Sequence, residues 1–149
     1  MRTVIQRVSK SSVTIDDKVY NFIDEGFMVL VGFTLDDDIN DINYIVKKIV
    51  NLRVFNDING VMNRSIIDVG GSILSISQFT LYADTKKGNR PSYKRALNGE
   101  HSSKLYDEFN KELSKYVNVK TGIFGSDMKV SLINDGPVTI IIDSKNKEF

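Results

Sequence analysis

Four strand-like segments near the start of the chain constrain its fold more than any other feature. They are rich in β-branched and other apolar residues, and turn-forming residues separate them, which is the pattern of neighbouring antiparallel strands. The segments span residues 3–8, 12–15, 19–22 and 27–31, with turn signals at residues 16–17 and 25–26. We therefore expect the fold to open with an antiparallel meander.

Two helical patterns follow this meander. Apolar residues at helical spacing predict a helix over residues 39–50, and three aspartates at 36–38 precede it, where carboxylates stabilise the positive end of a helix. Adjacent side chains diverge at a helix start, so these aspartates are not expected to converge on one metal ion. A second apolar stripe over residues 105–117 predicts another helix, with Ser102 or Ser103 as its N-cap.

Further strand patterns alternate with these helices. Residues 56–60 are the loop signal of a short hairpin, and residues 72–82 are the longest strand candidate. Near the end of the chain, Gly136 and Pro137 separate two apolar runs. Because proline cannot donate to a strand ladder, we expect a hairpin turn there, with outward-facing carbonyl groups. Consecutive strands interrupted by two helices indicate an α+β domain with antiparallel sheet.

Length and composition exclude several classes of protein. At 149 residues the chain has the usual size of one domain, and no apolar stretch is long enough to cross a bilayer. Residues 1–9 mix polar and aliphatic side chains, unlike a signal peptide, so we expect a cytoplasmic protein without membrane contact. Cysteine is absent, which rules out disulfides, thiolate metal sites and cysteine nucleophiles.

Catalysis by a histidine or a metal ion has little support in the sequence. His101 is the only histidine, and it lies beside Glu100 in a polar run before the second helix, where a solvated side chain is expected. A Ser-His-Asp arrangement would depend on this one residue, and no zinc-ligand spacing or glycine-rich phosphate loop is present. We therefore expect neither a metal ion nor a cofactor.

A basic segment at residues 86–95 is a candidate for contact with nucleic acid. The net charge of the chain is only +1, so any such contact is local. The segment contains no acid, and Tyr93 lies within it. Its basic residues are Lys86, Lys87, Arg90, Lys94 and Arg95. Basic groups suit phosphates and an aromatic ring can stack on a base, although a solvated lysine-rich loop has the same composition.

Residues 77–81 form the remaining candidate site. On an alternating strand, Gln78 and Thr80 share one face and can point into one pocket. Threonine also favours strands without any function, and glutamine often satisfies backbone groups. Both interpretations stay open on the residues alone.

Two motifs of this chain resemble the signature motifs of the D-aminoacyl-tRNA deacylase family. They are Ser-Gln-Phe-Thr-Leu-Tyr-Ala at residues 77–83 and Asn-Asp-Gly-Pro-Val-Thr at residues 134–139. Other segments resemble the family in the same order, so that the resemblance covers essentially the whole chain: residues 1–9, 30–32, 86–93 and 121–128. The departures are small, with Ser126 where a small residue, often alanine, is expected and a variable tail after Asp143.

The resemblance implies a hydrolase that removes D-amino acids, and also mischarged glycine, from the terminal adenosine of tRNA. It further implies a homodimer in which the peptide bond between Gly136 and Pro137 is cis and enters the active site of the partner subunit. Carbonyl groups of this motif would collide with an L side chain and leave room for a D side chain. Arg7 matches a family residue that braces the motif, and its alternative role is an exposed strand arginine.

The resemblance also implies an active site built on Ser77, Gln78, Phe79 and Thr80. Backbone amides around Phe79 and Thr80 would stabilise the oxyanion of ester hydrolysis, and Gln78 would orient nearby groups. We expect the 2′-hydroxyl of the substrate ribose to assist the reaction, rather than Thr80 as a nucleophile.

The expected contacts with tRNA lie outside this motif. Phe124 and Met128 resemble the part of the family that accommodates the terminal adenosine. Lys86, Lys87 and Arg90 are expected at the acceptor-stem phosphates.

A nucleic-acid-binding module without catalysis is the rival interpretation. In it, residues 86–95 are the whole site and the Gly-Pro turn is only structural. The expected fold is the same in both cases: α+β, a single domain over residues 1–149 of mainly antiparallel, barrel-like sheet with two main helices, a polar tail at 144–149, and assembly as a homodimer.

Overall fold

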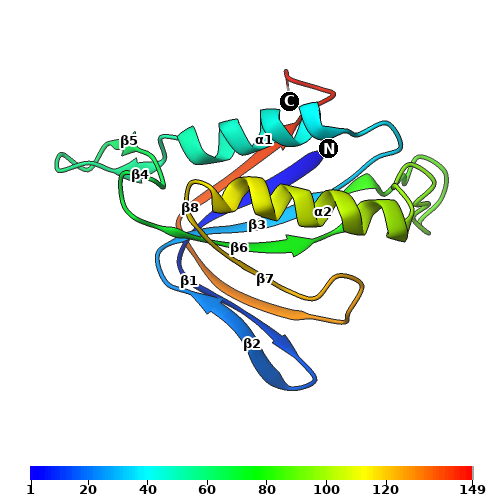
Figure 1. The fold of residues 1–149 in the computed structure, drawn as a ribbon, viewed down its shortest axis with the longest axis horizontal. Coiled ribbons are helices and arrows are strands. Elements are labelled where there is room, and N and C mark those ends of the chain that lie inside the picture. The colour runs from blue at the N-terminus through cyan, green and yellow to red at the C-terminus, as the bar shows by residue number, and fades with distance from the viewer. Residues whose placement is uncertain (149) are drawn as a thin grey trace.

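The computed structural model describes residues 1–148, in which two helices lie against a strongly curved sheet (Figure 1). The strands are β1 (Arg2–Ile15), β2 (Lys18–Ile23), β3 (Gly26–Gly32), β4 (Phe55–Asn56), β5 (Met62–Arg64), β6 (Ser72–Ser77), β7 (Asn118–Thr121) and β8 (Lys129–Asp143). The helices are α1 (Ile39–Asn51), α2 (Gly99–Ser114) and the short 3-10 helix η1 (Phe79–Tyr82). Phe149, the last residue of the expected polar tail, lies outside the described residues.

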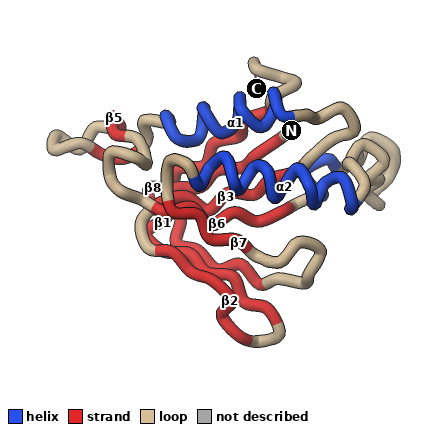
Figure 2. Tube along the Cα trace, viewed as in Figure 1, coloured by secondary structure: helices blue, strands red, loops and turns tan. Residues whose placement is uncertain are grey.

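The main sheet has the strand order β2-β1-β3-β6-β7, and β8 pairs with the other edge of β1. The pairs of β1 with β2, β3 and β8 are antiparallel, as is the separate pair of β4 and β5, whereas β3-β6 and β6-β7 are parallel. The strands curve beneath both helices into a nearly closed, barrel-like sheet (Figure 2). The predicted α+β class with mainly antiparallel sheet is confirmed, and the two parallel pairs are an addition to it.

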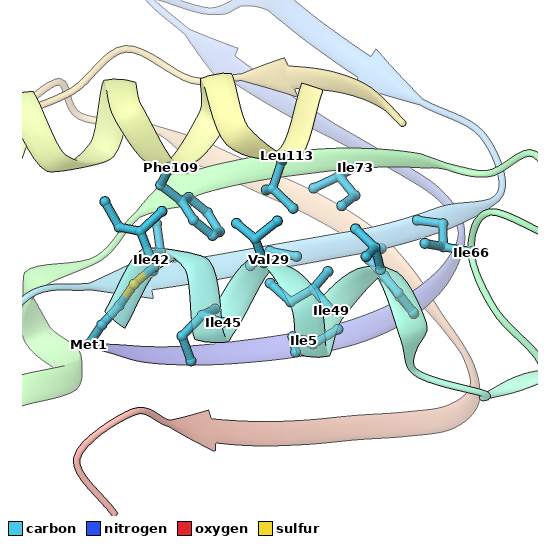
Figure 3. Close-up of a cluster of buried hydrophobic side chains, with 14 of the residues drawn as sticks. Met1, Ile5, Val29, Ile42, Ile45, Ile49, Ile66, Ile73, Phe109 and Leu113 are labelled. Atoms are coloured by element: carbon cyan, nitrogen blue, oxygen red, sulfur yellow. The ribbon is translucent and has the colours of Figure 1, made fainter. Parts of the chain in front are cut away.

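The core lies between the helices and the sheet. Side chains from α1 and α2 meet side chains from β1, β3 and β6 there (Figure 3). Those without measurable exposure include Ile42, Ile45, Ile49, Phe109, Leu113, Val29 and Ile73. Most of the apolar stripe predicted for the first helix is therefore buried, as are Phe109 and Leu113 of the second. The second stripe was predicted too long, because Tyr116 is exposed and lies with Val117 beyond the end of α2. No helix within residues 1–148 is both long and apolar enough to span a bilayer.

Helix α1 begins where the sequence predicts, because its start is encoded locally. The carboxylate of Asp38 accepts from the amides of Asn40 and Asp41, and Asp41 in turn accepts from the amide of Asp38. This reciprocal capping satisfies amides that have no partner inside the helix.

The predicted N-cap of α2 was wrong. Asn98 caps this helix, and its side-chain oxygen accepts from the amide of His101 at 3.1 Å. Ser102 lies inside the first turn, is buried, and donates its hydroxyl to the carbonyl of Leu97 at 3.0 Å. Both asparagine and serine are good caps, so the choice depended on where the preceding loop enters the helix.

Strand β1 corrects a second prediction. Residues 3–8 and 12–15 belong to one strand, not two, because β8 pairs with both halves of β1 while β3 and β2 share its opposite edge. The predicted tight turn after it is confirmed, since Asp16 and Asp17 both have positive φ angles, of 50° and 60°.

The hairpin turn predicted at Gly136 and Pro137 was also wrong. The chain does not reverse there: β8 pairs with β1 on both sides, with Asn134 opposite Val8 and Thr139 opposite Gln6. Residues 135–138 therefore stand opposite the single residue Arg7 and form a bulge. Proline is accommodated because a bulge, like a turn, leaves residues outside the ladder.

Candidate functional site

A cavity of about 590 Å³ opens at the end of the sheet where β3 and β6 finish. Its walls come from the ends of β3 and β6, the first residues after each of these strands, the chain leading into α2, the first turn of α2, the loop before β8 and the start of β8. The lining includes Val31, Phe33, Ser77, Gln78, Phe79, Tyr93, Leu97, Asn98, Ser102, Phe124, Asp127 and Met128. The fold thus brings motifs from distant parts of the sequence to one site.

Strand β6 ends at Ser77, so the long strand predicted over residues 72–82 was wrong. The amide of Gln78 makes the last contact with β3, donating to the carbonyl of Val31 at 2.7 Å, and the chain then turns into η1. The first amides of a helix have no partner within it. The N–H groups of Phe79, which lines the cavity, and of the next residue, Thr80, therefore have no partner within η1 and can donate to an oxygen atom of a ligand.

Gln78 and Thr80 are adjacent, although not for the predicted reason. The alternating faces of a strand were expected to bring them together, but the tight turn of η1 does so instead. The side-chain amide of Gln78 donates to the hydroxyl of Thr80 at 2.5 Å. Gln78 lines the cavity, whereas Thr80 is not among its lining residues.

No general base stands beside the hydroxyl of Thr80 among residues 1–148. Its contact is an amide, and His101 is exposed, outside the cavity lining, with its Nδ1 at 2.9 Å from the side-chain oxygen of Asn98. Within the same residues, no three histidine, aspartate or glutamate side chains are close enough to hold a metal ion.

The basic segment at residues 86–95, called the basic loop from here on, contributes Tyr93 to the cavity lining. The ring of Tyr93 packs edge-on against Phe79, with the ring centroids 4.9 Å apart, and both residues line the cavity. Lys86, Lys87 and Arg90 are exposed and outside the lining. Their charges form no ion pair with any residue in the described chain.

The loop at residues 122–128 supplies another part of the cavity wall. Phe124 and Met128 line the cavity, and the ring of Phe124 packs against Tyr106 with a centroid separation of 5.9 Å. A Cβ atom at Gly122 would collide with the sulfur of Met128, so glycine is needed for this side chain to pack. Asp127 also lines the cavity and was missed, although it lies inside a segment that carried the resemblance.

Gly136 and Pro137 are exposed and do not line this cavity. The peptide bond between them is cis. Gly136 has a φ of +131°, and a Cβ atom there would lie 2.8 Å from the Arg7 guanidinium, so both conformation and space require glycine.

Arg7 holds this bulge against the body of the protein. It is buried, its Nε donates to the carbonyl of Asp135 at 2.9 Å, and one terminal nitrogen donates to the carbonyl of Val54 at 2.5 Å. The alternative of an exposed strand arginine was therefore wrong. Arg7 connects the bulge to the chain between α1 and β4.

Comparisons with known proteins agree with this architecture. One solved structure, described as the c-Myc DNA Unwinding Element Binding Protein, superposes with a TM-score of 0.92 at 39% sequence identity, covering 96% of this chain and 98% of its own. Another, described as a probable eukaryotic D-amino acid tRNA deacylase, superposes with a TM-score of 0.80 over 95% of this chain and 97% of its own. At 17% identity, the second likeness shows the fold alone.

The comparison with protein families covers nearly the whole chain. Residues 4–143 match the family described as D-Tyr-tRNA(Tyr) deacylase. This range contains the cavity, the η1 amides and the Arg7-braced bulge. The chain therefore belongs to the D-Tyr-tRNA(Tyr) deacylase family, hydrolases of D-aminoacyl-tRNA.

Proposed function

We propose that this cavity binds the aminoacylated 3′ end of tRNA and hydrolyses the ester of a D-amino acid or of mischarged glycine. The observation that carries the proposal is the start of η1 at a cavity large enough for a nucleoside and its aminoacyl group: Phe79 lines this cavity, and the N–H groups of Phe79 and Thr80 have no partner within η1. Two such donors stabilise the oxyanion that forms when water attacks the ester carbonyl. The products are free amino acid and tRNA, and the enzyme works in the cytoplasm.

In this mechanism the protein supplies geometry rather than a nucleophile. The hydroxyl of Thr80 accepts a hydrogen bond from Gln78 and has no base to deprotonate it. The 2′-hydroxyl of the substrate ribose, next to the ester, assists the attack of water. Ser77 and Gln78 line the wall beside the reacting carbonyl.

Selectivity against L-amino acids comes from the bulge of a second subunit in a homodimer. Gly136 and Pro137 are exposed and lie outside the cavity of their own chain, which suits a role in a partner's cavity. Arg7 braces the segment through the Asp135 carbonyl. Carbonyl groups presented there would exclude an L side chain, and glycine, which has none, would escape this exclusion.

Contacts with the rest of the tRNA follow from the cavity walls. Phe124 and Met128 provide the apolar surface for the terminal adenine. Lys86, Lys87 and Arg90, exposed and unpaired on the basic loop, face the phosphates of the acceptor stem.

Incubation with D-Tyr-tRNA and L-Tyr-tRNA tests the proposed function. Release of D-tyrosine with little or no release of L-tyrosine is expected, measured as loss of acid-precipitable radiolabelled aminoacyl-tRNA. Equal release of both would contradict the selectivity, and release of neither would contradict the activity.

Replacing Thr80 with alanine separates a positioning role from a nucleophilic one. Thr80→Ala is expected to retain most of its kcat, because the backbone amides of η1 remain. A loss on the order of 10⁴-fold, the size expected on removing a nucleophile, would rule the mechanism out. Single-turnover rates measured with saturating enzyme give the comparison.

A second candidate is a binding role for DNA or RNA without catalysis. The solved structure with 39% identity is described as a DNA-element-binding protein, and the unpaired basic loop gives this chain a surface for phosphates. Binding of duplex DNA together with inactivity on D-Tyr-tRNA would favour this candidate.

A further inference from the structure

Asp127 is the one residue with a formal charge among those that line the cavity within residues 1–148. The rest of the lining is apolar or carries neutral polar groups such as Ser77, Gln78 and Asn98. The position is set by a tight turn in the loop before β8, in which Gly125 has a φ of +77° and the amide of Ser126 donates to the carbonyl of Ile123 at 3.2 Å. The loop therefore presents a single negative charge at the cavity wall.

The carboxylate of Asp127 has no internal role to account for it. It forms no hydrogen bond or ion pair with any residue in the described part of the chain, and it is exposed. By contrast, Asp38 caps a helix and Asp143 pairs with Arg2. Asp127 is thus free to meet a ligand.

A free carboxylate is unfavourable next to the 3′ end of an RNA, because the phosphates there are also negative. An aminoacyl ester brings one cation with it, the α-ammonium group on the carbon beside the ester carbonyl. An α-amino group titrates at about pH 7.7 to 8.0 in peptides, so a substantial fraction is protonated at neutral pH. The charge of Asp127 matches this group and opposes the other ionised groups of the substrate.

We propose that Asp127 binds the α-ammonium group of the aminoacyl ester and so orients the ester carbonyl towards the amides of Phe79 and Thr80. Asp127 is then a residue that determines specificity, and this role rests on the proposed deacylase function. It does not take part in bond breaking. The α-ammonium is the feature that an ester with a blocked amine lacks.

The test is a double cycle, in which the residue at position 127 and the amine of the substrate are each changed alone and then together. Wild-type protein and Asp127→Asn are compared on D-Tyr-tRNA and on N-acetyl-D-Tyr-tRNA, whose amine cannot carry a charge. A charged hydrogen bond predicts that the variant loses on the order of tenfold in kcat/KM on D-Tyr-tRNA. On the N-acetyl ester, the kcat/KM of the variant is expected to agree with that of the wild type within about twofold.

If the N-acetyl ester is hydrolysed too slowly for its kcat/KM to be measured, a binding measurement replaces the kinetic one. Competition by two non-hydrolysable analogues, 3′-D-tyrosylamino-3′-deoxyadenosine and its N-acetyl derivative, gives the same comparison as a ratio of inhibition constants. Asp127→Asn is expected to weaken the analogue with the free amine and to leave the other unchanged. Equal weakening of both would overturn the proposal, because it would place Asp127 against the ribose or the adenine.

Asp107→Asn is the matched control, since Asp107 is an exposed acid on α2 outside the cavity lining. It is expected to leave both kcat/KM values and the melting temperature unchanged.

Failure of the proposal for Asp127 can be told apart from failure of the proposed deacylase function. If wild-type protein hydrolyses D-Tyr-tRNA and Asp127→Asn does not discriminate the two analogues, only the role of Asp127 is wrong; if wild-type protein is inactive, both proposals fail.

Discussion

Charged groups near the two termini of the chain are paired with each other, whereas those at and near the cavity are not. In a cluster we call the terminal ionic cluster, the ammonium group of Met1 lies 2.5 Å from the carboxylate of Asp37, and Lys145 lies 2.9 Å from Asp41. The hydroxyl of Ser144 accepts from the same ammonium group at 2.9 Å. By contrast, Asp127 at the cavity wall and the cations of the basic loop outside it have no partner within residues 1–148.

This difference separates charges that stabilise the fold from charges that have no internal partner and are free to bind a ligand. Burial raises the pKa of Asp37, although the Met1 ammonium opposes the shift. Burial also pushes the pKa of Asp41 upward, but hydrogen bonds from Ser144, the Asp38 amide and Lys145 outweigh it and lower the pKa to about 2. A buried charge must be paired, whereas an exposed unpaired charge costs the fold little.

Removing the acid that faces the buried ammonium group is expected to have the largest effect on stability. Asp37→Asn leaves the Met1 ammonium without a counter-charge in a site where both side chains are fully buried, and should lower the free energy of unfolding by about 3 kcal/mol. Urea unfolding followed by circular dichroism measures it. Asp36→Asn is the control, because Asp36 is exposed and should change stability by less than about 0.5 kcal/mol. Equal midpoints for the two variants would show that the pair does not matter.

The free energy of unfolding should depend on pH through the protonation of Asp41. Its pKa is about 2 in the folded protein, against about 3.9 in an unfolded chain. The unfolded state therefore takes up a proton first as the pH falls. The stabilisation, on the order of 2 kcal/mol, is complete above about pH 5 and is lost between about pH 4 and pH 2.

Asp41→Asn should remove this part of the acid sensitivity. The variant is expected to be less stable near neutral pH and to show a shallower fall in the free energy of unfolding from about pH 5 to about pH 2. Urea titrations at several pH values across this window give the two slopes. Parallel slopes for the variant and the wild type would place the acid sensitivity in other groups.

Neutralising the basic loop should have the smallest effect on the fold while changing tRNA binding. A triple variant, with Lys86, Lys87 and Arg90 each replaced by Gln, should bind tRNA roughly tenfold more weakly and reduce the slope of log affinity against log salt by about 2 to 3. Its stability should change by less than about 0.5 kcal/mol, because these charges are unpaired. Lys104→Gln, on the exposed face of α2, is the control. An unchanged salt slope would refute a phosphate-binding role.

Features encoded by near neighbours were predicted well. The first helix was expected over residues 39–50 and spans Ile39–Asn51, because its apolar stripe and its Asp38 cap lie within a few residues of each other. The turn at Asp16 and Asp17 was equally local. Family membership was also readable, since the motifs at residues 77–83 and 134–139 need no fold to be recognised.

Features set by distant partners were predicted poorly. Residues 134–139 carry the local signals of a hairpin turn, yet β1 pairs with β8 on both sides of them and makes them a bulge. The end of β6 at Ser77 depends on where β3 stops pairing, because the amide of Gln78 makes the last contact with Val31. Strand register of this kind depends on side chains more than forty residues away, which no local pattern contains.

The sequence by itself determined the secondary-structure class, the absence of cysteine chemistry and the motifs of the family. Only the tertiary structure decided which of these residues share a site: Ser77, Gln78 and Phe79 join Phe124 and Met128 at one cavity, whereas Gly136 and Pro137 do not. It also brought Asp127 into that cavity and buried Arg7 behind the bulge. The physical reason is that a site is assembled by strand pairing and loop packing between distant segments, while a motif records only its own neighbours.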